Sequence, residues 1–264
     1  SDIPNNKVYK LSAENDTITY LHPSGFTKAN FTGHEPGSNG LLLNNEGELV
    51  LMQHGERRVA KMNASLDQPD ENYEAIVGTF RNKRLNSPND GIYDSKGNLY
   101  FSDPPYGLPE MLDDPNKELD FQGVYCLLTT GELLLIDADL KFPNGVTLSH
   151  DESVLYVAVS NPEKPAWYRY DIETPGKVSN KQVLLDVSEL VDEEFEQGLP
   201  DGLKVNSKEI IFATGPFGVW VLTQQGQVLA RIRTGQLTSN CALSADEKTL
   251  FMTADDYILS VALK

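Results

Sequence analysis

The chain repeats one short pattern five times, and this repetition constrains its fold more than any other feature of the sequence. Each copy contains an Asn or Asp, a short apolar run, a polar turn and a second apolar run. The copies begin at Asn39, Asn89, Asn144, Asp201 and Asn240. Their turns are rich in Asn, Asp, Gly, Ser and Lys, most of which tolerate left-handed backbone or bond to their own backbone. Each copy therefore predicts a β-hairpin.

Further strand-like runs follow the hairpins. Third strands are predicted at 57–62, 123–128, 167–172, 218–222 and 257–261, and fourth strands at 73–77, 132–136 and 228–232. Four strands per repeat are typical of a propeller blade. Residues 1–25 add two runs that resemble a third and a fourth strand without a hairpin of their own. The prediction is an all-β fold, a six-bladed β-propeller of four-stranded antiparallel blades whose first blade is incomplete at the N-terminus.

One blade cannot bury its apolar faces alone, so residues 1–264 are expected to form a single β-propeller domain. Helix-like sequence is nearly absent. The acidic segment 187–197 is the only stretch with helical character, and we interpret it as an excursion between two blades.

Charge and cysteine content exclude several classes of function. The chain carries 22 Lys plus Arg against 39 Asp plus Glu, a formal net charge of −17. Such a polyanion is a poor partner for nucleic acid or acidic lipid, and no apolar run approaches the roughly 18 residues of a membrane span. We expect a soluble protein, either cytoplasmic or exported after removal of a signal segment. Cys126 and Cys241 belong to no zinc or redox motif. Their pairing and the oligomeric state are left open.

The residues that head the five repeats are candidate ligands. Approximate rotational symmetry would place all five at one mouth of a central channel. Amide and carboxylate oxygens suit a hard cation such as Ca²⁺ or Mg²⁺. One divalent cation on the axis is the simplest inference. The alternative is that these residues only cap the starts of their strands.

Three other side chains are candidates for substrate contact, and each has a structural alternative. His54 could contact a substrate or move a proton, or it could be a structural histidine at a strand end. Asp90 could face the site or bond backbone N–H groups at its strand start. Tyr106 could stack on a substrate ring or fill space between blades. No nucleophile elbow, phosphate loop, dinucleotide fingerprint or zincin motif occurs, so attack by an activated water is expected.

Several short motifs carry a resemblance to a known family. They are Leu85-Asn-Ser-Pro-Asn-Asp, Phe101-Ser-Asp-Pro-Pro-Tyr-Gly, Phe142-Pro-Asn-Gly, Leu199-Pro-Asp-Gly-Leu-Lys-Val and Thr238-Ser-Asn-Cys-Ala. In order and spacing they resemble the senescence-marker-protein/gluconolactonase (regucalcin-like) family, in particular its bacterial gluconolactonase branch. The resemblance spans essentially the whole chain. It implies a six-bladed propeller that holds one catalytic divalent cation and hydrolyses sugar lactones.

The resemblance also implies roles for single residues. Asn144 and Asp201 match two metal ligands of the family, and Asp201 also matches its proposed base. Asn89 matches a residue that binds the ion or contacts the substrate. Independently of the resemblance, the residues themselves make Asn39, Asn240, His54, Asp90 and Tyr106 candidates for substrate contact. Ca²⁺ is the expected ion, with Mg²⁺, Mn²⁺ and Zn²⁺ as alternatives.

One family ligand has no counterpart in this chain. It is a glutamate in a Glu-Gly-Pro motif upstream of the segment that matches Ser1-Asp-Ile-Pro-Asn-Asn, and neither Glu14 nor Glu35 occupies its position. Either the natural protein extends further toward its N-terminus, which is the interpretation we favour, or metal binding by this chain is impaired. Two other functions remain alternatives: a phosphotriesterase resembling diisopropyl-fluorophosphatase that uses the same metal site, and a propeller that serves only as an interaction scaffold.

Overall fold

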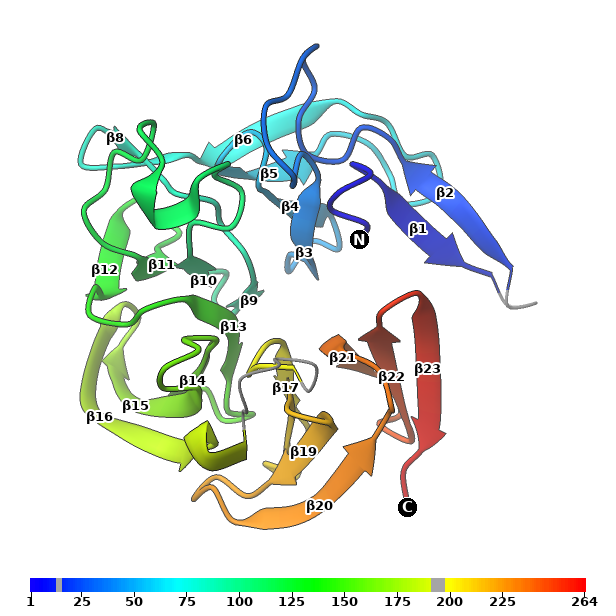
Figure 1. Cartoon of the computed structure of the whole chain (residues 1–264), viewed down its shortest axis with the longest axis vertical. Coiled ribbons are helices and arrows are strands. Elements are labelled where there is room, and N and C mark those ends of the chain that lie inside the picture. Colours follow the sequence, from blue (N-terminus) through cyan, green and yellow to red (C-terminus); the bar gives the residue numbers. More distant parts are fainter. Residues whose placement is uncertain (13–15, 191–197) are drawn as a thin grey trace. The chain divides into compact units, whose positions relative to one another are not determined.

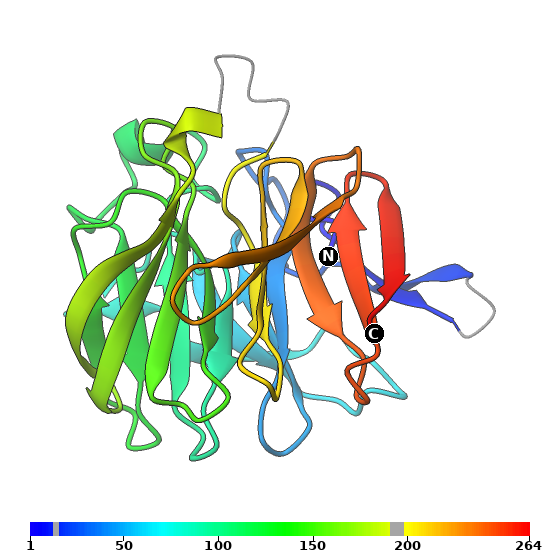
Figure 2. The ribbon, with the colours of Figure 1, turned by 90° about the horizontal axis from the view of Figure 1, so that it is seen from below.

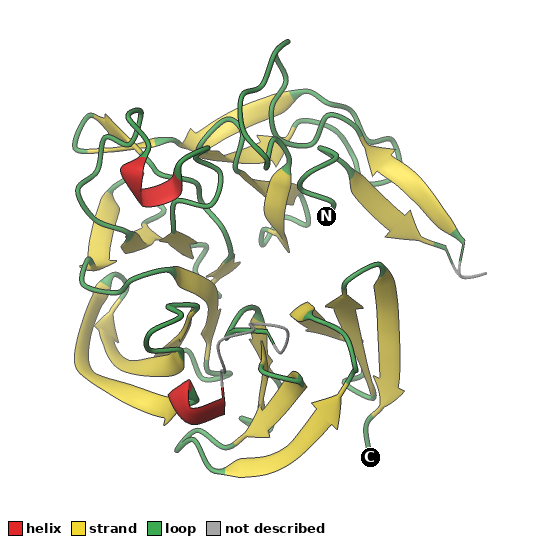
Figure 3. Cartoon of the chain, in the orientation of Figure 1, coloured by secondary structure: helices red, strands yellow, loops and turns green. Residues whose placement is uncertain are grey.

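The computed structural model describes residues 1–12, 16–190 and 198–264. Strands and turns make up nearly all of these residues (Figure 3). The only helical segments within the described ranges are two 3₁₀ turns, Met111–Asp113 and Ser188–Leu190. The chain divides into two compact units, which we call unit 1 (Ser1–Asp139) and unit 2 (Leu140–Lys264). Each unit is described by itself.

Unit 1 contains two four-stranded antiparallel sheets and two short hairpins (Figure 1). The first sheet comprises β3 (Ser38–Leu43), β4 (Leu49–Gln53), β5 (Arg58–Met62) and β6 (Tyr73–Val77). The second comprises β9 (Gly91–Tyr93), β10 (Leu99–Asp103), β11 (Gly123–Leu127) and β12 (Leu133–Asp137). The hairpins are β1 (Val8–Leu11) with β2 (Thr17–Leu21), and β7 (Thr79–Phe80) with β8 (Lys83–Arg84).

Unit 2 contains three antiparallel sheets, and within each sheet consecutive strands run alongside one another (Figure 2). The first comprises β13 (Pro143–Leu148), β14 (Val154–Val159), β15 (Ala166–Thr174) and β16 (Lys177–Asp186). The second comprises β17 (Leu203–Val205), β18 (Ile211–Gly215), β19 (Gly218–Leu222) and β20 (Val228–Arg233). The third has only β21 (Thr238–Leu243), β22 (Thr249–Ala254) and β23 (Tyr257–Ala262).

The all-β propeller class is confirmed, but the prediction of six blades is wrong. The described residues form five blades, four with four strands and the last with three. Strands β1 and β2 pair with each other in a separate two-stranded sheet. The physical reason is that residues 1–25 hold only two strand-forming runs, which is half of what a blade requires. The single domain over 1–264 stays a prediction.

The structure tests only part of the helical character that was expected at 187–197. Ser188–Leu190 form a 3₁₀ turn. Residues 191–197 lie outside the described residues, as does Glu14. No helix in the described ranges is long and apolar enough to cross a membrane. Cys126 and Cys241 are both buried free thiols.

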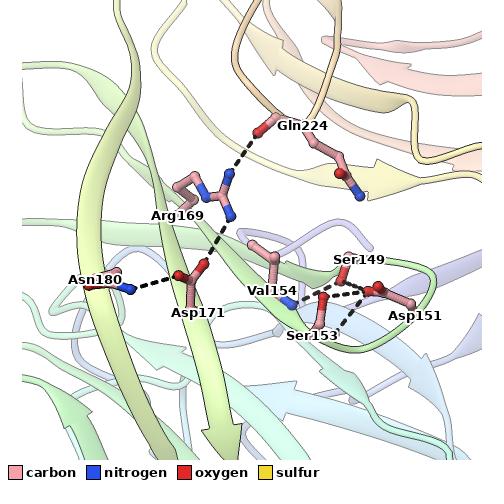
Figure 4. Close-up of polar contacts among 8 residues, drawn as sticks. All are labelled: Ser149, Asp151, Ser153, Val154, Arg169, Asp171, Asn180 and Gln224. Atoms are coloured by element: carbon pink, nitrogen blue, oxygen red, sulfur yellow. Dashed lines mark hydrogen bonds and ion pairs between the residues drawn. The ribbon is translucent and has the colours of Figure 1, made fainter.

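The predicted hairpins form because their turns satisfy their own backbone. Asn44 Oδ1 accepts the N–H groups of Glu46 at 3.1 Å and Glu48 at 2.8 Å, and Asn206 Oδ1 makes the same pair of bonds with Lys208 and Ile210. In the turn after β13, Ser149 Oγ donates to Asp151 Oδ1 at 2.7 Å and accepts Val154 N–H at 2.9 Å (Figure 4). These bonds are typical of Asx and Ser turns.

The blades pack through strands that are buried on both faces. Every residue of β10 and of β14 is buried. In unit 1, Phe101 and Tyr125 stack at 5.2 Å between ring centroids. In unit 2, Trp167 is fully buried and lies 5.8 Å from Trp220, also between centroids. This burial explains why the central strands are near-continuous apolar runs.

Candidate active site

In unit 1, backbone contacts bring the heads of two successive repeats together. The N–H of Gly40, which follows Asn39, donates to Asn89 O at 2.7 Å. A Cβ atom on Gly40 would lie 2.7 Å from that oxygen and 3.1 Å from Asp90 Oδ1. The glycine after Asn39 is therefore required for the close approach of the two strand starts.

Unit 2 repeats this arrangement with its three repeat heads. A Cβ atom on Gly145, which follows Asn144, would lie 2.2 Å from Asp201 O. A Cβ atom on Gly202, which follows Asp201, would lie 2.1 Å from Asn240 Cγ. The strand starts at Asn144, Asp201 and Asn240 thus pack in succession, as the repeat pattern predicts.

Asn144 is buried, and a serine orients its amide. Its Nδ2 donates to Ser160 Oγ at 2.8 Å, and Ser160 Oγ donates to Pro200 O at 2.6 Å. Because the nitrogen faces Ser160, the carbonyl oxygen Oδ1 is directed to the other side of the amide. Pro200 immediately precedes Asp201, so this chain of bonds also ties Asn144 to the next repeat. Ser160 is a positioning residue for Asn144 that the sequence reasoning missed.

Asp201 is partly exposed at the start of its repeat, and a buried threonine fixes its backbone. Asp201 N–H donates to Thr214 O at 3.1 Å. Thr214 Oγ1 donates to Gly202 O at 2.9 Å and to Ser239 O at 3.0 Å. Thr214 was also missed, and its signal is a lone hydroxyl in the apolar run Ile210-Ile-Phe-Ala-Thr.

The amide of Asn240 serves its own strand. Asn240 Oδ1 accepts the N–H of Cys241 at 2.8 Å, which favours a role in capping the strand start. A substrate contact through Asn240 stays a prediction, as does one through Asn39, which is partly exposed in β3.

Asn89 and Asp90 are buried at the start of the second sheet of unit 1. Asn89 N–H donates to Ser102 O at 2.9 Å, and Ser102 N–H donates to Asp90 O at 3.0 Å. Asp90 Oδ2 is buried and accepts no hydrogen bond within the described part of the chain. A buried carboxylate oxygen without a donor requires water, a cation or a ligand group. A contact between Asp90 and a substrate stays a prediction.

His54 lies directly after β4 and is fully buried. Its Nδ1 lies 2.6 Å from Glu35 Oε2. When Nδ1 carries the proton, it donates to Glu35 and leaves Nε2 as a proton acceptor. Nε2 has no partner among the described residues. Tyr106 lies partly exposed in the loop after β10.

Asp103, at the end of β10, is a buried acid of unit 1. Its Oδ2 accepts the N–H of Asn86 at 2.8 Å. Burial raises the pKa of Asp103 to about 7, although hydrogen bonds from Asn86 and Ser87 and the charge of Arg57 oppose that shift. The carboxyl group is therefore partly protonated at neutral pH.

This raised pKa predicts a pH dependence of stability. The unfolded pKa of Asp is about 3.9, so the folded state binds the proton more tightly. Protonation of Asp103 therefore stabilises the folded state. This stabilisation is fully present below about pH 4 and is lost as the pH rises to about 7. We expect Asp103→Asn, whose side chain cannot ionise, to remove a slope of up to about 1.4 kcal/mol per pH unit. Chemical denaturation at pH 5 and pH 7 measures it, with the exposed Asp120→Asn as control. Equal slopes in parent and variant would contradict the assignment.

The donor chemistry fits a hard cation held by amide oxygens. No group of three or more His, Cys, Asp or Glu side chains that could hold a metal occurs in the described ranges. A cation would therefore depend on oxygens such as Asn144 Oδ1 and the Asp201 carboxylate, whose strand starts are neighbours. Oxygen donors of this kind suit Ca²⁺ or Mg²⁺.

Comparison with known proteins identifies the family. The model of the SMP-30/gluconolactonase/LRE-like region matches residues 1–256. A gluconolactonase of Zymomonas mobilis is 32% identical over 268 residues, which cover 100% of this chain and 74% of the relative. A solved gluconolactonase structure from Xanthomonas campestris has a TM-score of 0.82 at 26% identity and covers 100% of this chain and 81% of its own. The diisopropyl-fluorophosphatase of Loligo vulgaris is 28% identical over 120 residues, which cover 44% of this chain and 38% of that enzyme.

The match to the family model covers nearly the entire chain and agrees with the motifs that first suggested a relationship. The chain therefore belongs to the SMP-30/gluconolactonase/LRE-like family.

Proposed function

We propose that this chain is a lactonase that opens a small sugar lactone with the help of one bound divalent cation, Ca²⁺ in the first instance. The observation that carries the proposal is the similarity to a gluconolactonase over 100% of this chain. The succession of Asn144 and Asp201 on neighbouring strand starts supports it, because amide and carboxylate oxygens are suitable ligands for a hard divalent cation.

Asn144 and Asp201 would hold the cation, with Asn89 proposed as a third ligand from the sequence pattern. A bound divalent cation polarises a carbonyl group and lowers the pKa of water. Asp201 accepts the proton of the attacking water at its carboxylate. The water oxygen bonds to the carbonyl carbon, the ring C–O bond breaks, and the leaving ring oxygen takes up the proton that Asp201 had accepted, so that the product is a hydroxy acid.

The other residues bind and orient the substrate in this proposal. Ser160 holds the amide of Asn144 in one orientation. His54, paired with Glu35, presents Nε2 as a proton acceptor, and Asp90 presents Oδ2 to a hydroxyl group of the sugar. Asn39, Tyr106 and Asn240 complete the proposed contacts.

The two alternative functions have weaker support. A phosphotriesterase rests on a similarity that covers 44% of this chain. An interaction scaffold rests on the fold alone, whereas a gluconolactonase is 32% identical to this chain over 100% of its length. A panel that contains δ-gluconolactone and diisopropyl fluorophosphate separates all three, because a scaffold hydrolyses neither.

Removal of divalent cations is expected to lower kcat/KM for δ-gluconolactone by at least about 100-fold, since a cation supplies several kcal/mol of charge stabilisation. The test strips the protein with a chelator, dialyses the chelator away and follows acid release in a pH-stat. Added Ca²⁺ should restore the rate. A stripped protein that retains its full rate would refute the metal-dependent mechanism.

A further inference from the structure

We propose that unit 1 carries a second binding site, for the oxyanion of a small molecule, in a basic pocket beside the turn between β4 and β5. The pocket has a volume of about 200 Å³. Arg57, Arg84 and Lys28 line it, together with Glu56 and the rings of Phe26 and Phe31. Three cationic side chains against one carboxylate make this pocket positive in a chain whose net charge is −17.

Arg57 is a buried cation that forms no ion pair with a carboxylate in the described part of the chain. Its side chain is largely inaccessible, since the residue is only 6% exposed. Nε donates to Leu85 O at 2.8 Å and Asn86 O at 3.0 Å, and Nη1 donates to Asn116 O at 2.8 Å. Nη2 is buried without a partner among the described residues. A buried charge that meets only neutral acceptors is costly unless a counter-charge completes it.

A second guanidinium adds to the positive field. Burial lowers the pKa of Arg57, and repulsion from Arg84 lowers it further. Arg84 donates from Nη2 to Glu56 O at 3.1 Å, a neutral acceptor. Neither arginine forms an ion pair with a carboxylate within the described ranges, whereas Lys28 lies 3.7 Å from Glu56 Oε2. An anion between the two guanidinium groups would relieve this repulsion.

The nearby acids do not replace such an anion. Asp103, Asp114 and Glu118 attract Arg57 electrostatically, but among the residues that the structure describes none of them forms an ion pair or hydrogen bond with it. Asp103 is partly protonated at neutral pH, because burial raises its pKa to about 7. These carboxylates therefore balance the positive charge of the pocket only in part.

The shape of the pocket favours an organic anion. A volume of about 200 Å³ equals roughly seven water molecules at about 30 Å³ each. The rings of Phe26 and Phe31, 5.1 Å apart between centroids, offer an apolar wall to a carbon skeleton. Arginine side chains bind carboxylate or phosphate oxygens through paired N–H groups. A sugar acid or other small carboxylate fits the volume of the pocket, its apolar wall and its arginine side chains. A phosphate would offer the same kind of oxygen atoms to the arginines.

The pocket opens at the same end of unit 1 as Asn39 and Asn89. Ser38 pairs with Gln53, so the turn that carries Arg57 emerges beside the start of β3. Phe101 pairs with Gly91, so the loop after β10, which also lines the pocket, emerges beside the start of β9. A small acid bound there would lie at the substrate-facing end of these blades.

The test is calorimetric titration of the full chain with sodium gluconate and, separately, with inorganic phosphate. The protein is first stripped of metal, so that no bound cation holds the anion. Arg84→Gln removes an exposed pocket cation, and Arg57→Lys keeps the charge but loses the paired N–H groups. Lys83→Gln is the matched control, because Lys83 pairs with the exposed Asp120 and does not line the pocket. Thermal unfolding confirms that each variant is folded.

We expect saturable binding of one equivalent of gluconate. Its Kd should rise about tenfold in Arg84→Gln and in Arg57→Lys, as expected for the loss of a charge-assisted hydrogen bond, and stay within about twofold in Lys83→Gln. Tighter binding of phosphate with the same variant pattern would support the site and identify a phosphate as its occupant. No saturable binding of either anion, or equal losses in Lys83→Gln, would overturn the proposal. Because the titration uses metal-free protein, its outcome is independent of lactonase activity.

Discussion

Replacement of Asp201 by asparagine is expected to reduce kcat for lactone hydrolysis by about 10²- to 10⁴-fold, the usual contribution of a general base. Asp201 is the only carboxylate among the five residues that head the repeats. Asparagine keeps the shape and one oxygen donor, but it cannot accept the proton of water. Its backbone bonds to Thr214 remain available, so folding should change little.

Metal content must be measured beside the rate, since the substitution also weakens a ligand. Asp246→Asn is the matched control, because Asp246 lies exposed in a hairpin turn of the same unit. A variant of Asp201 that retains its metal and a kcat within about threefold of the parent would exclude the role of base. A variant that fails to fold would instead favour the strand-cap interpretation.

Gly145→Ala is expected to cost about 3 kcal/mol of stability, at the upper end of what overpacking costs, and to reduce lactonase activity as well. The new methyl group would lie 2.2 Å from Asp201 O, and backbone cannot move aside as a flexible side chain can. The strand start that carries Asp201 must therefore shift away from Asn144. Chemical denaturation and kcat/KM together measure the effect.

Gly78→Ala is the appropriate control, because its Cβ would meet Arg58 Cβ at 3.4 Å and Arg57 O at 3.8 Å, both ordinary contact distances. That variant should keep both its stability and its rate. If Gly145→Ala also behaved like the parent, the close packing of the two strand starts would not be needed for either property.

Most of the strands could be predicted from the sequence because each hairpin carries its own signal. Asn44 and Asn206 cap turns through bonds that span two and four residues, and such local bonds leave a pattern in the sequence. The number of blades could not be predicted as reliably as the individual strands. The prediction of a sixth blade assumed that the hairpin of β1 and β2 pairs with further strands. In the structure, β1 and β2 form a sheet of two strands only.

The same distinction applies to the candidate site. The strand-start residues were predictable because they recur with the repeat. The residues that position them act over longer separations: Ser160 bonds Asn144 from 16 positions away, Thr214 bonds Ser239 from 25, and Glu35 lies 19 positions from His54. A single sequence does not name the partners of such long-range contacts: even Thr214, a lone hydroxyl in an apolar run, gives no sign that it bonds to Ser239.

The self-capped hairpin turns offer attachment points for probes. In each hairpin, the residue that heads the repeat lies at one end of the first strand, and the turn lies at the other end. The turn after β9 illustrates this: Asp94 Oδ1 holds the N–H groups of Lys96 and Asn98, while the Ser95 and Lys96 side chains are exposed. A fluorophore attached through Ser95→Cys would thus be separated from Asn89 by the length of the strand. Labelled in this way, the protein could be immobilised or tracked in titrations without modification of its candidate site.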